Sequence, residues 1–252
     1  MQAVQAKGYR AAGCPLLPDA DDDAVKAYRD AAETADIVIA EVGAWSNPLS
    51  ANEKERLAAI DKCTKGLDLA DRIGARCCVN IAGSRGPQWD GPDPRDLTEE
   101  TFEMTVQSVR EIVDAVKPTA THYTIEMMPW MYPDSADSYL RLLAAVDRKE
   151  VAVHLDPVNI VNSPERFFRN AYLIRECFTK LGPHIVSCHA KDISLGTQLT
   201  VHLDEVRPGM GELDYEVFLN ELDRLDPDIP LMLEHLPNEA EYDLAAQHIR
   251  SI

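Results

Sequence analysis

The chain has few basic residues for its size. Its 252 residues include 25 Lys and Arg against 43 Asp and Glu, which gives a formal net charge of −18. A strongly acidic surface repels phosphate backbones and anionic lipid headgroups. The composition therefore argues against nucleic acid as a partner and against binding to a membrane surface.

Long apolar stretches are also missing from the chain. No run approaches the roughly 18 apolar residues of a transmembrane helix. The first ten residues, MQAVQAKGYR, contain no apolar core of a signal peptide. We therefore expect a cytoplasmic protein.

Cysteine is present but without a functional spacing. The six cysteines lie in or beside apolar runs, and their spacing matches neither a zinc site nor a small disulfide scaffold. This placement is typical of reduced cysteines that pack in a core.

Short apolar runs alternate with longer amphipathic ones, and this alternation is typical of βαβ units and a parallel sheet. Strands are predicted over Tyr9–Leu16, Asp36–Trp45, Ala75–Gly83, His122–Trp130, Val151–Ile160, His184–Ile193 and Pro230–Leu236. Helices are predicted over Asp22–Ala35, Asn52–Ile73, Thr98–Val116, Ser135–Ala145, Pro164–Leu181, Tyr215–Leu225 and Glu239–Ile252.

This order of elements predicts one α/β domain over residues 1–252 with the (β/α)8 TIM-barrel fold. Seven strands have clear signals where a closed barrel needs eight. We therefore expect the first strand and most of the first helix to be lacking at the N-terminus, which leaves an edge strand that favours homo-oligomers. The alternative is a doubly wound sheet, but no G-x-G-x-x-G follows any strand.

Four of the predicted strands end on a group that binds metal ions. These groups are Glu126, Asp156, His189 and Glu234. The carboxyl ends of parallel barrel strands converge on one face, where active sites are built. Three carboxylates and one imidazole suit Mn²⁺, Mg²⁺ or Co²⁺ better than a structural zinc.

A single strand-end glutamate is more often a loop charge, so the hypothesis rests on the four groups together. It requires them to lie within bonding range of one ion, with no Lys or Arg in place of that ion. His154 points the same way as Asp156 and is either a core histidine or a support for the metal ligands. Lys191 shares the face of His189, while Asp192 can orient a neighbour by hydrogen bonding.

Five segments carry a resemblance to a known family. They are YTIEMMP with Glu126, HLDPVN with Asp156, CHAKD with His189, RPGMGELDY over Arg207–Tyr215, and LMLEHL with Glu234. Over nearly its whole length the sequence resembles the sugar isomerase/epimerase superfamily of xylose-isomerase-like TIM barrels, which includes D-tagatose 3-epimerase and D-psicose 3-epimerase.

The resemblance implies a metal site and a reaction. Glu126, Asp156, His189 and Glu234 would bind one divalent cation, usually Mn²⁺, and Glu126 and Glu234 would exchange protons with a sugar. The residue types agree with this chemistry, because a divalent ion stabilises an enediolate and two carboxylates can serve two faces of one carbon. The implied function is a metal-dependent sugar isomerase or epimerase.

The chain departs from the ketose epimerases at two positions. Asn159 stands where they have a histidine, and Leu195 where they have a substrate-binding arginine. Arg207 takes over the second task or pairs with an acid such as Glu205.

Two further strand-end residues are candidates for a sugar pocket. Trp45 offers an aromatic platform and Asn80 an amide, both suited to polyhydroxy ligands. Packing beneath a loop is the alternative for Trp45. With His154, Asn159 and Arg207, they complete the expected substrate-binding set.

Two other functions remain compatible with the same residues. The first is a lyase or dehydratase that acts on a keto-sugar or cyclitol through the same metal site. The second is a sugar-binding barrel without turnover. A trinuclear-zinc endonuclease is disfavoured, because it needs more strand-end histidines and because the net charge opposes DNA.

Overall fold

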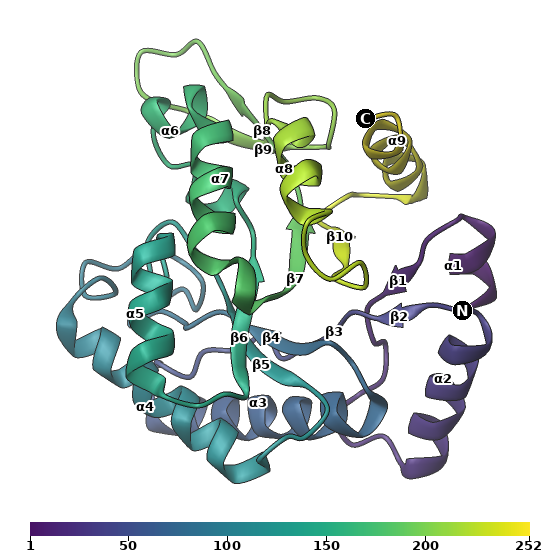
Figure 1. The fold of residues 1–252 in the computed structure, drawn as a ribbon. Helices are drawn as coiled ribbons and strands as arrows, with labels where there is room; N and C mark the ends of the chain where they lie inside the picture. Colours follow the sequence, from purple (N-terminus) through teal and green to yellow (C-terminus); the bar gives the residue numbers. More distant parts are fainter.

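A curved parallel β-sheet lies inside the molecule in the computed structural model, which describes residues 1–252, and helices cover its outer face (Figure 1). Six strands are hydrogen-bonded in the order β10-β7-β6-β5-β4-β3, and every pairing is parallel. They are β3 (Glu41–Gly43), β4 (Cys77–Asn80), β5 (His122–Glu126), β6 (Val151–Leu155), β7 (Ile185–Ala190) and β10 (Leu231–Leu233). The alternating pattern of the sequence is confirmed as a partly closed TIM barrel.

The sheet continues past β3 through a bent segment. β2 (Val38–Ile39) precedes β3 with only Ala40 between them, and it pairs in parallel with β1 (Ala11–Ala12). The hydrogen-bonded sheet is open between β1 and β10, and a groove of about 590 Å³ lies there, lined by both strands. The expectation of a barrel short of one strand therefore agrees with the structure.

The helices follow their strands and pack side by side around the sheet, from α2 through α3, α4, α5 and α7 to α8 (Figure 1). The bounds are α1 (Gln2–Ala6), α2 (Asp22–Thr34), α3 (Glu53–Ile73), α4 (Glu99–Val116), α5 (Ala136–Val146), α6 (Pro164–Phe168), α7 (Asn170–Leu181), α8 (Tyr215–Leu222) and α9 (Glu239–Arg250), with 3-10 turns η1 (Val158–Ile160) and η2 (Gly182–His184). Local sequence fixes their starts: the side chains of Asn52, Thr98 and Ser135 accept backbone N–H groups at the first turns of α3, α4 and α5.

Several expectations about the elements were wrong in their extent. The strands expected to reach Trp130 and Ile160 end at Glu126 and Leu155, and the strand expected over Asp36–Trp45 is divided at Ala40. The strand expected over Tyr9–Leu16 is only Ala11–Ala12. The helix expected over Pro164–Leu181 breaks at Arg169, whose φ of −121° and ψ of 27° are not helical. The strand expected to reach Ile193 ends at Ala190, and Ile193 lies in a separate antiparallel hairpin of β8 (Asp192–Leu195) and β9 (Leu203–Val206).

The core forms two apolar clusters, one between α3, α4 and the sheet and one beneath α7 and α8. All six cysteines are free, and all but Cys14 are buried, as expected of packing residues. None of the helices has the length and apolar character needed to cross a membrane.

The Tyr139 hydroxyl ties α5 to the two strands that carry the site. It is fully buried, and the carbonyl oxygens of Ile125, at 2.6 Å, and Ala152, at 3.0 Å, share its one hydrogen. It also accepts the N–H groups of Ile125 and His154 at 3.2 and 3.3 Å. One side chain therefore satisfies backbone groups of both β5 and β6.

We predict that Tyr139→Phe lowers the free energy of unfolding by roughly 1–3 kcal/mol, because buried backbone groups lose their partner. Urea denaturation followed by circular dichroism measures the change. Tyr172→Phe, at a position 60% exposed, is the matched control. Equal stability of the two variants would contradict the role of the Tyr139 hydroxyl.

Candidate metal centre

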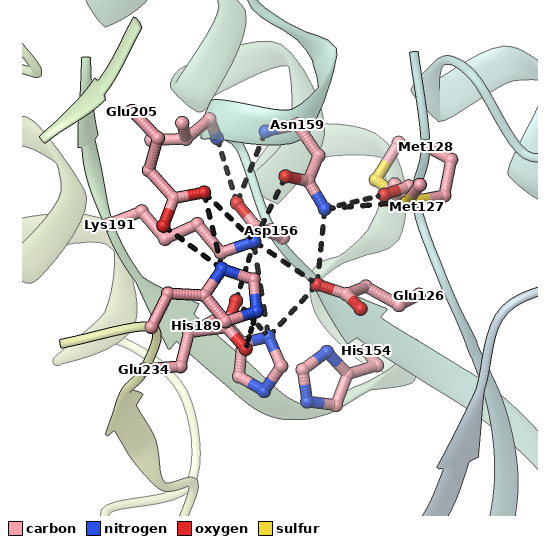
Figure 2. A network of polar contacts seen from close by, with 12 residues as sticks. Glu126, Met127, Met128, His154, Asp156, Asn159, His189, Lys191, Glu205 and Glu234 are labelled. Atoms are coloured by element: carbon pink, nitrogen blue, oxygen red, sulfur yellow. Dashed lines mark hydrogen bonds and ion pairs between the residues drawn. The ribbon is translucent and has the colours of Figure 1, made fainter. Parts of the chain in front are cut away.

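Four acidic or imidazole side chains from different strands meet at the carboxyl end of the sheet. Glu126 is the last residue of β5, Asp156 follows β6, His189 lies in β7 and Glu234 follows β10. The parallel register aligns these ends, since His189 is opposite Met232 and Glu126 is opposite His154. Figure 2 shows the side chains turned toward one another.

The ligand atoms of these four residues all lie within 4.8 Å of one another. His189 Nδ1 is 2.9 Å from Glu126 Oε1, 2.9 Å from Glu234 Oε1 and 3.9 Å from Asp156 Oδ2. The predicted convergence of the four residues is therefore observed, and the group could hold a metal ion.

The pKa values in this cluster shift in opposite directions. Burial of Asp156, which is fully inaccessible, raises its pKa to about 7 against the opposing charge of Lys191. Burial acts in the same sense on Glu126 and Glu234, but the hydrogen bond to His189 and the positive charges of His189 and Lys191 together outweigh it. The pKa of Glu126 is lowered to about 2, and that of Glu234 is lowered as well.

Lys191 joins this cluster of carboxylates. Its Nζ lies 2.6 Å from Glu234 Oε1, 2.9 Å from Asp156 Oδ2 and 3.8 Å from Glu126 Oε1 (Figure 2). The requirement that no lysine pair with these carboxylates in place of the ion is therefore not met in this structure. The metal hypothesis rests on the convergence of the four groups alone. The period-2 pattern had placed Lys191 on the face of His189, but only the fold brings its ammonium among carboxylates of other strands.

The donor set nevertheless fits a divalent cation. Asp156 Oδ2 and Glu234 Oε1 are buried oxygens that lie 2.9 and 2.6 Å from Lys191 Nζ without a well-aligned hydrogen bond to it. Glu234 Oε1 is also 2.9 Å from His189 Nδ1. The one hydrogen bond of the Lys191 ammonium goes to Asn159 Oδ1 at 3.0 Å. Carboxylate oxygens such as these are the ligands that hard divalent cations prefer.

His154 and Glu41 form a second group beside the first. His154 Nε2 is 3.0 Å from Glu41 Oε2, and His189 Nε2 is 3.5 Å from Glu41 Oε1. Both imidazoles hold the pKa of Glu41 below its usual value, although burial favours the neutral acid. The rings of His154 and His189 meet edge to face at 4.1 Å. His154 thus contacts the metal candidates through His189 and Glu41.

Asn159 also contacts the cluster. Its amide donates to Glu126 Oε1 and to the Met127 carbonyl oxygen, both at 3.1 Å. Its amide oxygen accepts a hydrogen bond from the Lys191 ammonium, so Asn159 links that ammonium to the Glu126 carboxylate.

The other expected pocket residues have partners elsewhere. Asn80 is buried and binds the backbone N–H of Ser46 and the thiol of Cys63. Trp45 packs against the core cluster, across Gly43. Arg207 Nε pairs at 2.8 Å with Glu241 of α9 rather than with Glu205.

A loop beside the site depends on Asp192. Its buried carboxylate accepts backbone N–H groups of Ile193, Gly209, Gly211 and Leu213 at 2.8–2.9 Å. A Cβ at Gly211 would lie 2.4 Å from Asp192 Oδ1, so the loop needs glycine there. This contact explains Gly211 of RPGMGELDY, whereas Gly209 has a positive φ of 92°.

Sequence reasoning missed the contribution of Glu205. It lies in β9 of the unexpected hairpin, 3.7 Å from Lys191 Nζ, and its carboxylate accepts from His235 at 3.0 Å. No periodic signal in a short, exposed strand identified it.

A family profile described as xylose isomerase-like TIM barrel matches residues 1–252. No curated protein sequence matches the chain.

Solved structures resemble the chain in fold at low identity. D-psicose 3-epimerase from Clostridium cellulolyticum is 16% identical, with a TM-score of 0.71 over 99% of this chain and 90% of its own. The probable 3-DHS dehydratase AsbF from Bacillus anthracis is 18% identical, with a TM-score of 0.72 over 99% and 90%. Endonuclease IV from Thermus thermophilus is 15% identical, with a TM-score of 0.72 over 99% and 91%.

We predict that Asp192→Asn lowers the free energy of unfolding by roughly 1–3 kcal/mol, because an amide cannot accept all four N–H groups. Hydrogen exchange of residues 207–213 should also accelerate. Urea denaturation and exchange mass spectrometry measure both effects. Asp204→Asn, at an exposed position of the same hairpin, is the control, and unchanged exchange in Asp192→Asn would refute the anchoring role.

Proposed function

Because the chain belongs to the xylose isomerase-like TIM barrel family, we propose that it is a divalent-metal-dependent isomerase or epimerase of a sugar or sugar derivative. The reaction moves a proton at a carbon next to a carbonyl group. This proposal goes beyond the family match, since proteins of this fold include an epimerase, a probable dehydratase and an endonuclease.

The observation that carries the proposal is the pair of glutamates that face one imidazole. Glu126 Oε1 and Glu234 Oε1 are each 2.9 Å from His189 Nδ1. They come from β5 and from the end of β10, and β6 and β7 lie between those strands in the sheet. Two carboxylates from separate strands can approach one substrate carbon from two sides.

Glu126, Asp156, His189 and Glu234 would hold one divalent cation. Three oxygens and one imidazole nitrogen favour Mn²⁺, with Mg²⁺ or Co²⁺ as alternatives. When bound, the cation supplies positive charge that stabilises negative charge developing on substrate oxygens.

The two glutamates have the charge state that proton abstraction needs. The pKa of each is lowered by His189 despite burial, so both are ionised at neutral pH. One glutamate takes the proton from carbon, and the other takes up a proton from water and delivers it to the opposite face of that carbon. The first glutamate then releases its proton to water, so both return to the ionised state. Glu126 is 5% exposed, whereas the Glu234 side chain is 16% exposed and nearer to solvent.

The substrate is expected to be a small polyhydroxy compound rather than a nucleic acid. The net charge of −18 opposes a phosphate backbone, which disfavours an activity like that of endonuclease IV. A dehydratase would use the same carboxylates to take the proton but would then lose a hydroxyl group.

We predict that Glu126→Gln and Glu234→Gln each reduce proton exchange by roughly 10²–10⁴-fold, because an amide cannot act as the base. Both should also bind Mn²⁺ more weakly. Purified protein with Mn²⁺ would be incubated with a panel of ketoses and inososes in deuterated water. Mass spectrometry would then measure the masses of the products.

The matched control is Glu111→Gln, at an exposed position of α4. The product of an epimerase is heavier than the substrate by the exchanged deuterium. The product of a dehydratase is lighter by one water molecule. Binding of metal and sugar without any hydrogen exchange would contradict the proposed reaction and support a sugar-binding barrel.

A further inference from the structure

The Lys191 ammonium is in contact with the oxygens that a metal ion would need. Glu234 Oε1, Asp156 Oδ2 and Glu126 Oε1 are the atoms nearest to His189 Nδ1, and the same three atoms surround Lys191 Nζ at 2.6, 2.9 and 3.8 Å. A divalent cation and an ammonium group repel each other, so their simultaneous contact with the same oxygens at short range is unfavourable. The two cations therefore compete for these oxygens.

The Lys191 ammonium has partners other than the metal-binding candidates. Glu205 Oε2 lies 3.7 Å from Nζ on the side of the hairpin, and Asn159 Oδ1 already accepts a hydrogen bond from the ammonium at 3.0 Å. Glu205 is held in position by His235 Nδ1 at 3.0 Å. The ammonium therefore already has a further carboxylate within 4 Å that is not one of the metal-binding candidates.

Only the tip of the side chain is free to make this change. The Lys191 carbonyl oxygen accepts the Tyr215 hydroxyl at 2.6 Å, and the next residue, Asp192, anchors the loop that contains Gly209 and Gly211. The backbone of Lys191 is thus fixed on both sides, while its side chain keeps the flexible stem of a lysine. The side chain is 3% exposed, so the ammonium must keep a charged partner in any position.

We propose that Lys191 is an internal cation that competes with the metal ion for Asp156 and Glu234 and transfers to Glu205 when the metal ion binds. This inference rests on the metal site of the proposed function. Lys191 acts here as a positioning residue: it holds three buried carboxylates together and sets how tightly the site binds a divalent cation.

The test is a double-mutant cycle on metal affinity. Mn²⁺ binding would be measured by titration calorimetry on chelator-treated, dialysed wild type, Lys191→Met, Glu205→Gln and the double variant. Lys191→Met should bind Mn²⁺ about tenfold more tightly or better, because the competing charge is gone. Glu205→Gln should bind it several-fold more weakly, because the displaced ammonium has no carboxylate partner.

The double variant separates competition from general electrostatics. Glu205→Gln should have no effect in the Lys191→Met background, since no ammonium remains to be received. If Glu205→Gln weakens binding equally in both backgrounds, or if Lys191→Met binds Mn²⁺ no more tightly than wild type, the proposal is overturned.

Thermal unfolding gives a second measurement, in which Lys191→Met should be weakened without metal although it binds Mn²⁺ more tightly. Lys191→Met should melt at a lower temperature than wild type in chelator, because three carboxylates lose their counter-ion, and it should gain more from added Mn²⁺. Should Lys191→Met not fold in chelator, Lys191→Gln and Glu205→Gln still test the same predictions. Lys180→Met is the control, because Lys180 of α7 pairs with Asp137 of α5 and Glu176 of α7 and with none of the metal-binding candidates.

Failure of this inference is distinct from failure of the proposed function. If wild type, Lys180→Met and Lys191→Met all bind no Mn²⁺, the metal site itself is refuted. If wild type binds Mn²⁺ and Lys191→Met does not bind it more tightly, only the role of Lys191 is refuted. Tighter binding by Lys191→Met supports both.

Discussion

Compensation of buried negative charge is the constraint on which this site depends. Glu126 and Asp156 are almost completely inaccessible, and Glu234 lies beside them. Carboxylates at such short range would repel one another or take up protons without positive charge among them. His189 and Lys191 supply that charge. Burial raises the pKa of Asp156, whereas the hydrogen bond to His189 and the charges of His189 and Lys191 lower the pKa of Glu126 despite its burial.

The fold meets this constraint through its strand ends and through one hairpin. The carboxyl ends of β5, β6, β7 and β10 bring the four ligand candidates to one face, and Tyr139 fixes two of those strands. The hairpin of β8 and β9 adds Glu205 from outside the sheet. A positive charge at the carboxyl ends of the strands therefore has Asp156 and Glu234 as partners at the sheet and Glu205 as a partner on the hairpin. This arrangement suits an exchange between the Lys191 ammonium and a bound cation.

Hydrogen bonds to one carboxylate connect this chemistry to the surrounding loop. Asp192 gathers four N–H groups from β8 and from residues 209–213, directly after Lys191. The lysine backbone is thereby held while its ammonium stays among several acceptors. A backbone held by hydrogen bonds and a flexible side chain suit competition between two cations, because the ammonium can change partners without a change in the strands.

The sequence by itself determined the strand and helix order, the four metal-binding candidates and the shared face of His189 and Lys191, because these depend on periodicity and on strand ends. Only the tertiary structure decided that the Lys191 ammonium meets Glu234 and Asp156, that Arg207 pairs with Glu241, and that Glu205 reaches the site. Such contacts join side chains of different elements, and their distances depend on register, on a hairpin and on loop anchoring that no local pattern encodes.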